Sequence, residues 1–116
     1  MALARFRNHG KAHMKLEELK EEVFAQHLNT KFYVRLEDRS VELELIKVVG
    51  DKSSMDKLEG VERFAIYFAG PSDFFLPQHI YNMEHEALGE MLIFIVPVGA
   101  QNGRYQYEAV FNHMEK

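Results

Sequence analysis

The sequence predicts a mainly β (α+β) protein, in which about six antiparallel strands form a barrel, a curled sheet or a sandwich, with one N-terminal α-helix. Short runs of aromatic and β-branched residues recur along the chain, and compact turn sequences separate them. One segment near the N-terminus has helical periodicity instead. Six strands with short connections usually curl or close, because closure removes exposed edges.

The expected helix covers residues 14–28. Four apolar residues lie at the spacing of one helix face, and glutamates occupy the other faces. Acidic residues near the start suit the helix dipole, and Asn29-Thr30 is the expected stop. The apolar stripe consists of Leu16, Leu19, Val23 and Phe24.

The expected strands alternate apolar and polar residues with a period of two. The segment 37–40 is the first hairpin turn, 50–60 is a polar loop, and Gln101-Asn102-Gly103 is a tight turn. The strands are expected at 31–36, 41–49, a third run that Gly70-Pro71 ends, 79–85, 91–98 and 104–111.

A chain of 116 residues is expected to form a single domain. Residues 14–116 carry the helix and strand patterns, whereas residues 1–13 show no periodicity. We therefore expect residues 1–13 to be a leader or a flexible arm. The alternative is an arm that docks on a neighbouring subunit through Leu3 and Phe6.

Composition excludes several classes of function. The chain has no cysteine, which removes disulfides, thiol catalysis and thiolate metal sites, and fits a cytoplasmic protein. No apolar run reaches the ~18 residues of a membrane span. Residues 1–13 hold three basic residues and no acid, whereas the rest of the chain holds all 18 acidic residues against 11 basic ones. This acidic domain is a poor match for nucleic acid, which needs clustered Lys and Arg.

The segment 71–77, bounded by prolines, carries the candidate interaction loop. Phe74, Phe75 and Leu76 are three consecutive apolar residues in a predicted loop. They either plug one end of a barrel or form an exposed patch for a partner or a second subunit.

Four residues are candidates for a small pocket: Asp73, Tyr81, Glu84 and His85. Asp73 in a Pro-bounded loop could contact a ligand, although turn capping is the commoner role. His79 and His85 share one strand face but lie too far apart to bind one metal, and His85 could instead pair with Glu90 across a hairpin. No catalytic set, phosphate-binding loop or cofactor motif is present, so no catalytic, cofactor or metal residue is assigned.

Several sequence blocks resemble a family of short, stand-alone bacterial proteins that is classed as a domain of unknown function. The resemblance covers about residues 14–112. It implies no activity, cofactor or catalytic residue; it suggests accessory proteins, some beside phage-tail-like genes or in mobile gene cassettes. The blocks are FAIYFAGP (64–71), LPQHIYNMEHEALGE (76–90), FIVPVG (94–99) and YEAVFN (107–112).

These observations lead to two hypotheses of different classes. The first is a non-enzymatic accessory or interaction protein, a homodimer or the partner of another protein, that associates through the Phe74–Leu76 loop. The alternative is a small-molecule-binding protein or small enzyme with a pocket at one end of the barrel. The alternative requires at least two of the four pocket candidates to converge in a concave site.

Overall fold

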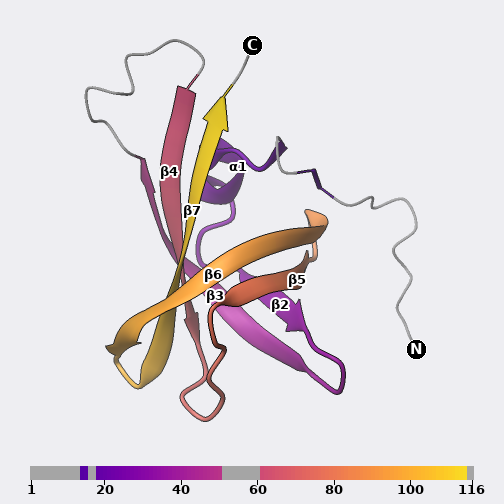
Figure 1. The fold of residues 1–116 in the computed structure, drawn as a ribbon, viewed down its shortest axis with the longest axis vertical. Helices are drawn as coiled ribbons and strands as arrows, with labels where there is room; N and C mark the ends of the chain where they lie inside the picture. Colours follow the sequence, from indigo (N-terminus) through magenta and orange to yellow (C-terminus); the bar gives the residue numbers. More distant parts are fainter. Residues whose placement is uncertain (1–13, 16–17, 51–60, 115–116) are drawn as a thin grey trace.

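The alternating runs form six antiparallel strands, which with one short helix make up the described part of the chain (Figure 1). The structure is a computed structural model, and it describes residues 14–15, 18–50 and 61–114. The expected leader (1–13), Leu16 and most of the expected loop (51–60) lie outside these residues. The elements are α1 (Glu21–Ala25), β2 (Lys31–Arg35), β3 (Ser40–Gly50), β4 (Val61–Gly70), β5 (His79–His85), β6 (Gly89–Gln101) and β7 (Arg104–Met114).

The strands close into a barrel in the order β2-β3-β4-β7-β6-β5, so the barrel is confirmed among the three expected arrangements. Two long strands make the closure possible, because each pairs with different neighbours along its two halves. In β6, residues 89–95 pair with β5 and residues 96–101 pair with β7. In β3, residues 40–44 pair with β2 and residues 44–50 pair with β4.

Irregular positions in the strands lie where their residue types require them. The ladder between β6 and β7 shifts register between Pro97 and Gly99, as expected for a proline that cannot donate to a ladder. Asn102 and Gly103 connect β6 to β7, and both have positive φ, 55° and 76°. Two such residues form the tight hairpin turn that the sequence predicted.

The helix is shorter than expected, since only Glu21–Ala25 is α-helical rather than residues 14–28. Lys20 is extended, with φ −103° and ψ 162°, and this separates the helix from a preceding turn. In that turn, the Glu18 side chain accepts a hydrogen bond from the Lys15 backbone N–H at 2.9 Å. Asn29 then takes a positive φ of 67°, which ends the segment at the expected stop.

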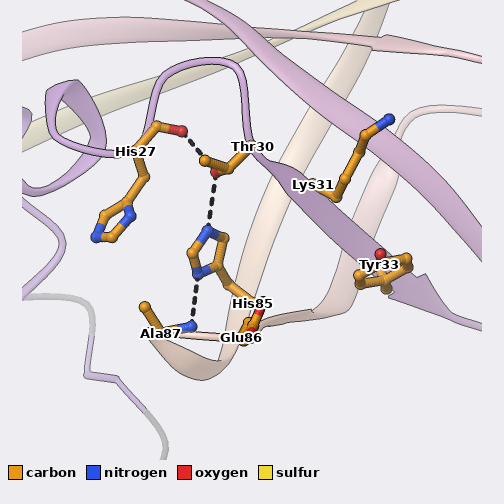
Figure 2. Close-up of a pocket in the computed structure, with 7 residues that line it drawn as sticks. All are labelled: His27, Thr30, Lys31, Tyr33, His85, Glu86 and Ala87. Carbon is orange, nitrogen blue, oxygen red and sulfur yellow. Dashed lines mark hydrogen bonds between the residues drawn. The ribbon is translucent and has the colours of Figure 1, made fainter.

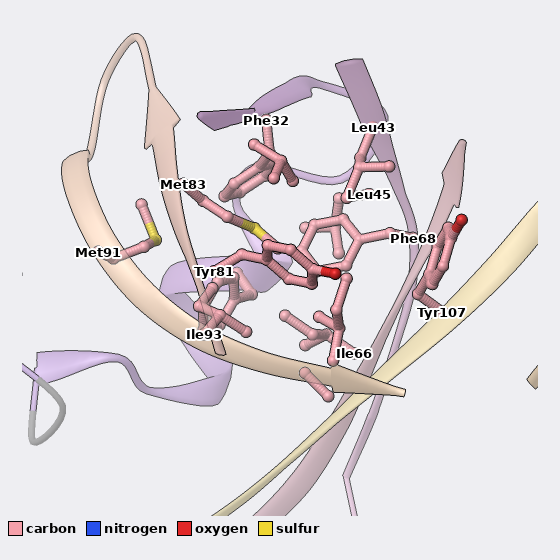
Figure 3. Close-up of a cluster of buried hydrophobic side chains, with 14 of the residues drawn as sticks. Phe32, Leu43, Leu45, Ile66, Phe68, Tyr81, Met83, Met91, Ile93 and Tyr107 are labelled. Carbon is pink, nitrogen blue, oxygen red and sulfur yellow. The ribbon is translucent and has the colours of Figure 1, made fainter. Parts of the chain in front are cut away.

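Every second residue of the strands faces inward, and these side chains fill the barrel interior (Figure 3). Phe32 and Phe68 meet edge to face, with ring centroids 5.2 Å apart. Alternation of buried and exposed residues is expected of an antiparallel strand that has one face on the core. The core strand residues include Phe32, Val34, Leu43, Leu45, Phe64, Ile66, Phe68, Tyr81, Met83, Met91, Ile93, Ile95, Tyr107, Ala109 and Phe111.

Phe24 from α1 closes one end of the barrel. Its side chain is fully buried, and its ring lies 5.4 Å from Phe111, 6.0 Å from Phe64 and 6.3 Å from Phe32. In Figure 1, α1 lies beside β7 and above β6, where these two strands diverge. The helix therefore supplies core that the sheet lacks at this end.

Leu76 closes the other end, from the loop between β4 and β5. It is 1% exposed, and its backbone N–H donates to the Tyr107 hydroxyl at 3.0 Å. The Tyr81 hydroxyl donates to the Pro77 carbonyl at 2.6 Å, which fixes the next residue of the loop. Two buried tyrosines thus hold the loop over the barrel.

We expect Phe24→Ala to lower the free energy of unfolding by about 3–5 kcal/mol, because it leaves a cavity among three aromatic rings. Leu28→Ala is the matched control: Leu28 is 38% exposed, so a change within ~1 kcal/mol is expected. Urea unfolding followed by circular dichroism measures both. Equal effects of the two substitutions would contradict the role given to Phe24.

We expect alkali to destabilise the barrel. Burial raises the pKa of Tyr107 and of Tyr81, and the hydrogen bond to Glu108 raises the pKa of Tyr67. The folded protein therefore holds these protons more tightly than the unfolded chain, so their contribution is complete below about pH 10 and is lost as the pH rises above it.

Urea unfolding between pH 8 and pH 11 checks this dependence. Tyr107→Phe should cost ~1 kcal/mol at pH 8, because the Leu76 N–H loses its acceptor, and should flatten the decline above pH 10. Tyr33→Phe, at a position that is 38% exposed, is the control for the substitution itself and should cost little at pH 8. A decline in Tyr107→Phe as steep as that of the wild type would refute the assignment.

Candidate functional site

Among the described residues, an apolar cluster lies on the outside of β5 and β6. Ile80, Leu92 and Phe94 are 56%, 60% and 48% exposed, although all three are large hydrophobic residues. Ile80 is the cross-strand partner of Phe94, and Leu92 lies two residues before Phe94 on the same strand face. Together with the half-buried Val96, they form a contiguous patch, which we name the β5–β6 face.

Polar residues border this patch at one end. Glu84 and Glu90 are cross-strand partners, so two carboxylates lie side by side in the row after Asn82 and Leu92. Arg35 on β2 forms an ion pair with Glu84. An apolar centre with a charged border is the usual organisation of a protein-binding surface.

The candidate interaction loop is only partly available at the surface. Leu76 is buried as the barrel plug, and Phe74 is half-buried with the Arg39 guanidinium 4.5 Å from its ring centroid. Phe75 is 49% exposed and packs edge to face on Tyr105, with centroids 5.2 Å apart. Of the three loop residues, Phe75 alone offers a large exposed surface.

The structure does not bring the four pocket candidates together. Tyr81 and His85 point into the barrel, with Met83 between them on the same strand face, and Tyr81 is bonded to the plug loop. Glu84 lies on the opposite face of the strand, where it pairs with Arg35. Asp73 is exposed in the loop between β4 and β5.

His85 is 6% exposed, and both of its ring nitrogens are engaged (Figure 2). Nδ1 accepts the Ala87 backbone N–H at 2.9 Å, so the proton of the neutral ring must lie on Nε2. Nε2 is 2.9 Å from the Thr30 hydroxyl, which itself donates to the His27 carbonyl at 2.6 Å. The ring therefore donates to Thr30 and ties the β5–β6 turn to the segment after α1.

An open pocket of about 480 Å³ lies beside this histidine. Few of its polar groups are available to a ligand. His85 already makes hydrogen bonds within the fold, and Lys31 donates a hydrogen bond to Glu42 at 2.7 Å. That hydrogen bond raises the pKa of Lys31. Within the described ranges, no group of three His, Asp or Glu side chains is arranged to hold a metal ion. Figure 2 shows the lining residues His27, Thr30, Lys31, Tyr33, His85, Glu86 and Ala87.

Sequence reasoning missed the β5–β6 face, although one signal for it exists. Residues 91–98, MLIFIVPV, are all apolar, so both faces of this strand are apolar. This is the pattern of a strand that is covered on both faces. In the barrel, Met91, Ile93 and Ile95 fill the interior, so Leu92 and Phe94 must lie outside. The run predicts that something covers the outer face as well.

Comparison with known proteins gives a family but no relative of known function. A family model described as a domain of unknown function, DUF6916, matches residues 6–111. The match begins inside the expected leader, at Phe6, and ends at Phe111. Searches of curated proteins and of solved structures found no match. No helix in the described part of the chain is long and apolar enough to cross a membrane.

We expect His85→Ala to destabilise the fold by about 2–4 kcal/mol, because it leaves a cavity and removes the bonds to Ala87 and Thr30. His85→Asn should cost less, since the side-chain oxygen can replace Nδ1 as the acceptor for the turn. Thr30→Val should remove only the Nε2 partner and cost ~1 kcal/mol. Urea unfolding ranks the three variants, and an unaffected His85→Ala would contradict a structural role.

Proposed function

We propose that this chain, which belongs to the DUF6916 family of domains of unknown function, is a non-enzymatic accessory protein that acts by protein–protein contact and self-associates through the β5–β6 face. The carrying observation is the contiguous exposure of Ile80, Leu92 and Phe94 on paired strands. Apolar residues scattered singly over a surface need no explanation, whereas a contiguous patch on paired strands does.

The size of the patch supports a modest interface. Three large side chains, each about half exposed, present on the order of 300 Å² of apolar surface, comparable with the largest patch of an ordinary monomer, which is often functional. Two copies that bury this patch and its polar border would reach the low end of stable interfaces, roughly 1,200 Å² in total. We therefore expect weak association that depends on concentration.

The site chemistry supports binding over catalysis. The buried histidine holds the fold through both ring nitrogens, and the buried tyrosine hydroxyls of Tyr81 and Tyr107 hold the plug loop. A small-molecule function has less support: the open pocket beside His85 gathers none of the other three pocket candidates.

The loop between β4 and β5 has a secondary place in this proposal. Leu76 is committed to the core, and only Phe75 of the three loop residues is largely exposed. We therefore place the principal contact on the β5–β6 face rather than on the loop.

Light scattering coupled to size-exclusion chromatography, over a concentration series, tests the proposal. The wild-type chain should shift from monomer to dimer as concentration rises, and Phe94→Ser should weaken association at least tenfold. Val49→Ser is the matched control, because Val49 is 40% exposed on β3, which pairs with β2 and β4 rather than with β5 or β6. It should associate as the wild type does.

Phe75→Ser tests the contribution of the loop to association separately from that of the β5–β6 face. It should leave the dissociation constant within a factor of about two. A wild-type chain that stays monomeric at millimolar concentration would refute the proposal. So would a Phe94→Ser variant that associates as the wild type does.

A further inference from the structure

We infer that the partner on the β5–β6 face is a second copy of this chain, related by a two-fold axis that lies in the interface and crosses the strands at Phe94. This inference rests on the proposed self-association and adds its geometry. In it, Phe94 faces Phe94 of the second copy and Leu92 faces Val96. The antiparallel arrangement follows from the distribution of charged and apolar residues along the two strands.

The outer residues form successive rows across β5 and β6. One row holds Glu84 and Glu90, the next Asn82 and Leu92, and the next Ile80 and Phe94, as the register pairs them. Val96 follows on β6, where its partner is Glu108 on β7. Rows on one strand face are about 7 Å apart.

The apolar column on β6 is symmetric about Phe94. Leu92 lies one row to one side and Val96 one row to the other, and both are aliphatic. A two-fold axis across the strands at Phe94 therefore places aliphatic side chains against aliphatic side chains. The same surface can meet itself, which is what an isologous interface requires.

Charge selects this axis over the other two-fold arrangement. An axis that runs along the strands would place each row against the identical row of the second copy. The row with Glu84 and Glu90 would then face the same acidic row of that copy. Like charges in apposition at an interface disfavour association, although Arg35 offsets part of the charge of Glu84. The axis across the strands separates the two acidic rows and places each at the rim, near the exposed Val98 end of the other copy.

The strand geometry is compatible with this packing. Sheets that pack face to face lie about 10 Å apart, with their strands within about 30° of one another. In Figure 1, β6 runs across the front of the barrel, so its outer face is not covered by another described element. The apolar run 91–98 would then be buried on both faces, inside by the core and outside by the second copy.

Cysteine crosslinking tests the axis directly, because the chain has no native cysteine. A mixture of the single variants Leu92→Cys and Val96→Cys, treated with a short bis-maleimide, should give a crosslinked heterodimer. Leu92→Cys alone should give little, since its two copies would be offset by about 13 Å along the strands in addition to the ~10 Å between the sheets. Both variants keep Phe94, so the centre of the interface stays intact. Val49→Cys, at an exposed position on β3 that pairs with neither β5 nor β6, should not crosslink.

The outcomes separate the inference from the proposed function. Light scattering of each cysteine variant before crosslinking shows whether it associates. If the variants are dimeric but Leu92→Cys crosslinks with itself, or the Leu92→Cys and Val96→Cys mixture gives no heterodimer, the axis is wrong and self-association stands. If the wild type and all variants are monomeric at millimolar concentration, both the proposed function and the inference fail.

Discussion

Closure of the barrel through two shared strands is the constraint on which the other features depend. β3 and β6 each pair with one neighbour along their first half and with another along their second half. Six strands close in this way only if neighbouring strands diverge beyond their paired segments. Apolar side chains from outside the sheet must then fill both ends. Phe24 fills one end and Leu76 the other, and each is almost fully buried.

The same constraint decides which residues of β6 face away from the core. Its first half supplies Met91, Ile93 and Ile95 to the core, and the intervening Leu92 and Phe94 therefore face outward beside Ile80 of β5. These positions lie outside the core, so packing inside the barrel does not require apolar residues there. We attribute their apolar character to the proposed contact with a second copy of the chain.

Local patterns predicted most of the fold, whereas long-range pairing set the rest. Alternation of apolar and polar residues predicted the six strands, and the Asn102-Gly103 turn and the Asn29 stop followed from local backbone chemistry. The helix was overestimated, because the apolar stripe that includes Leu19 is shared between a turn and a shorter helix. The sequence did not distinguish a plug from a patch at Phe74–Leu76, since the buried Tyr107 hydroxyl that receives the loop lies 31 residues away. The β5–β6 face was missed because residues 91–98 predicted a strand but not which of its apolar residues face outward.

The central claim is that the outer surface of β5 and β6 is an interface, and amide chemical shifts measured by NMR over a dilution series test it most directly. The account predicts concentration-dependent shifts concentrated at Ile80, Leu92, Phe94 and their strand neighbours. The amides of α1 and of the loop around Phe75 should stay constant. Shifts confined to the Phe75 loop, or none up to millimolar concentration, would contradict the account.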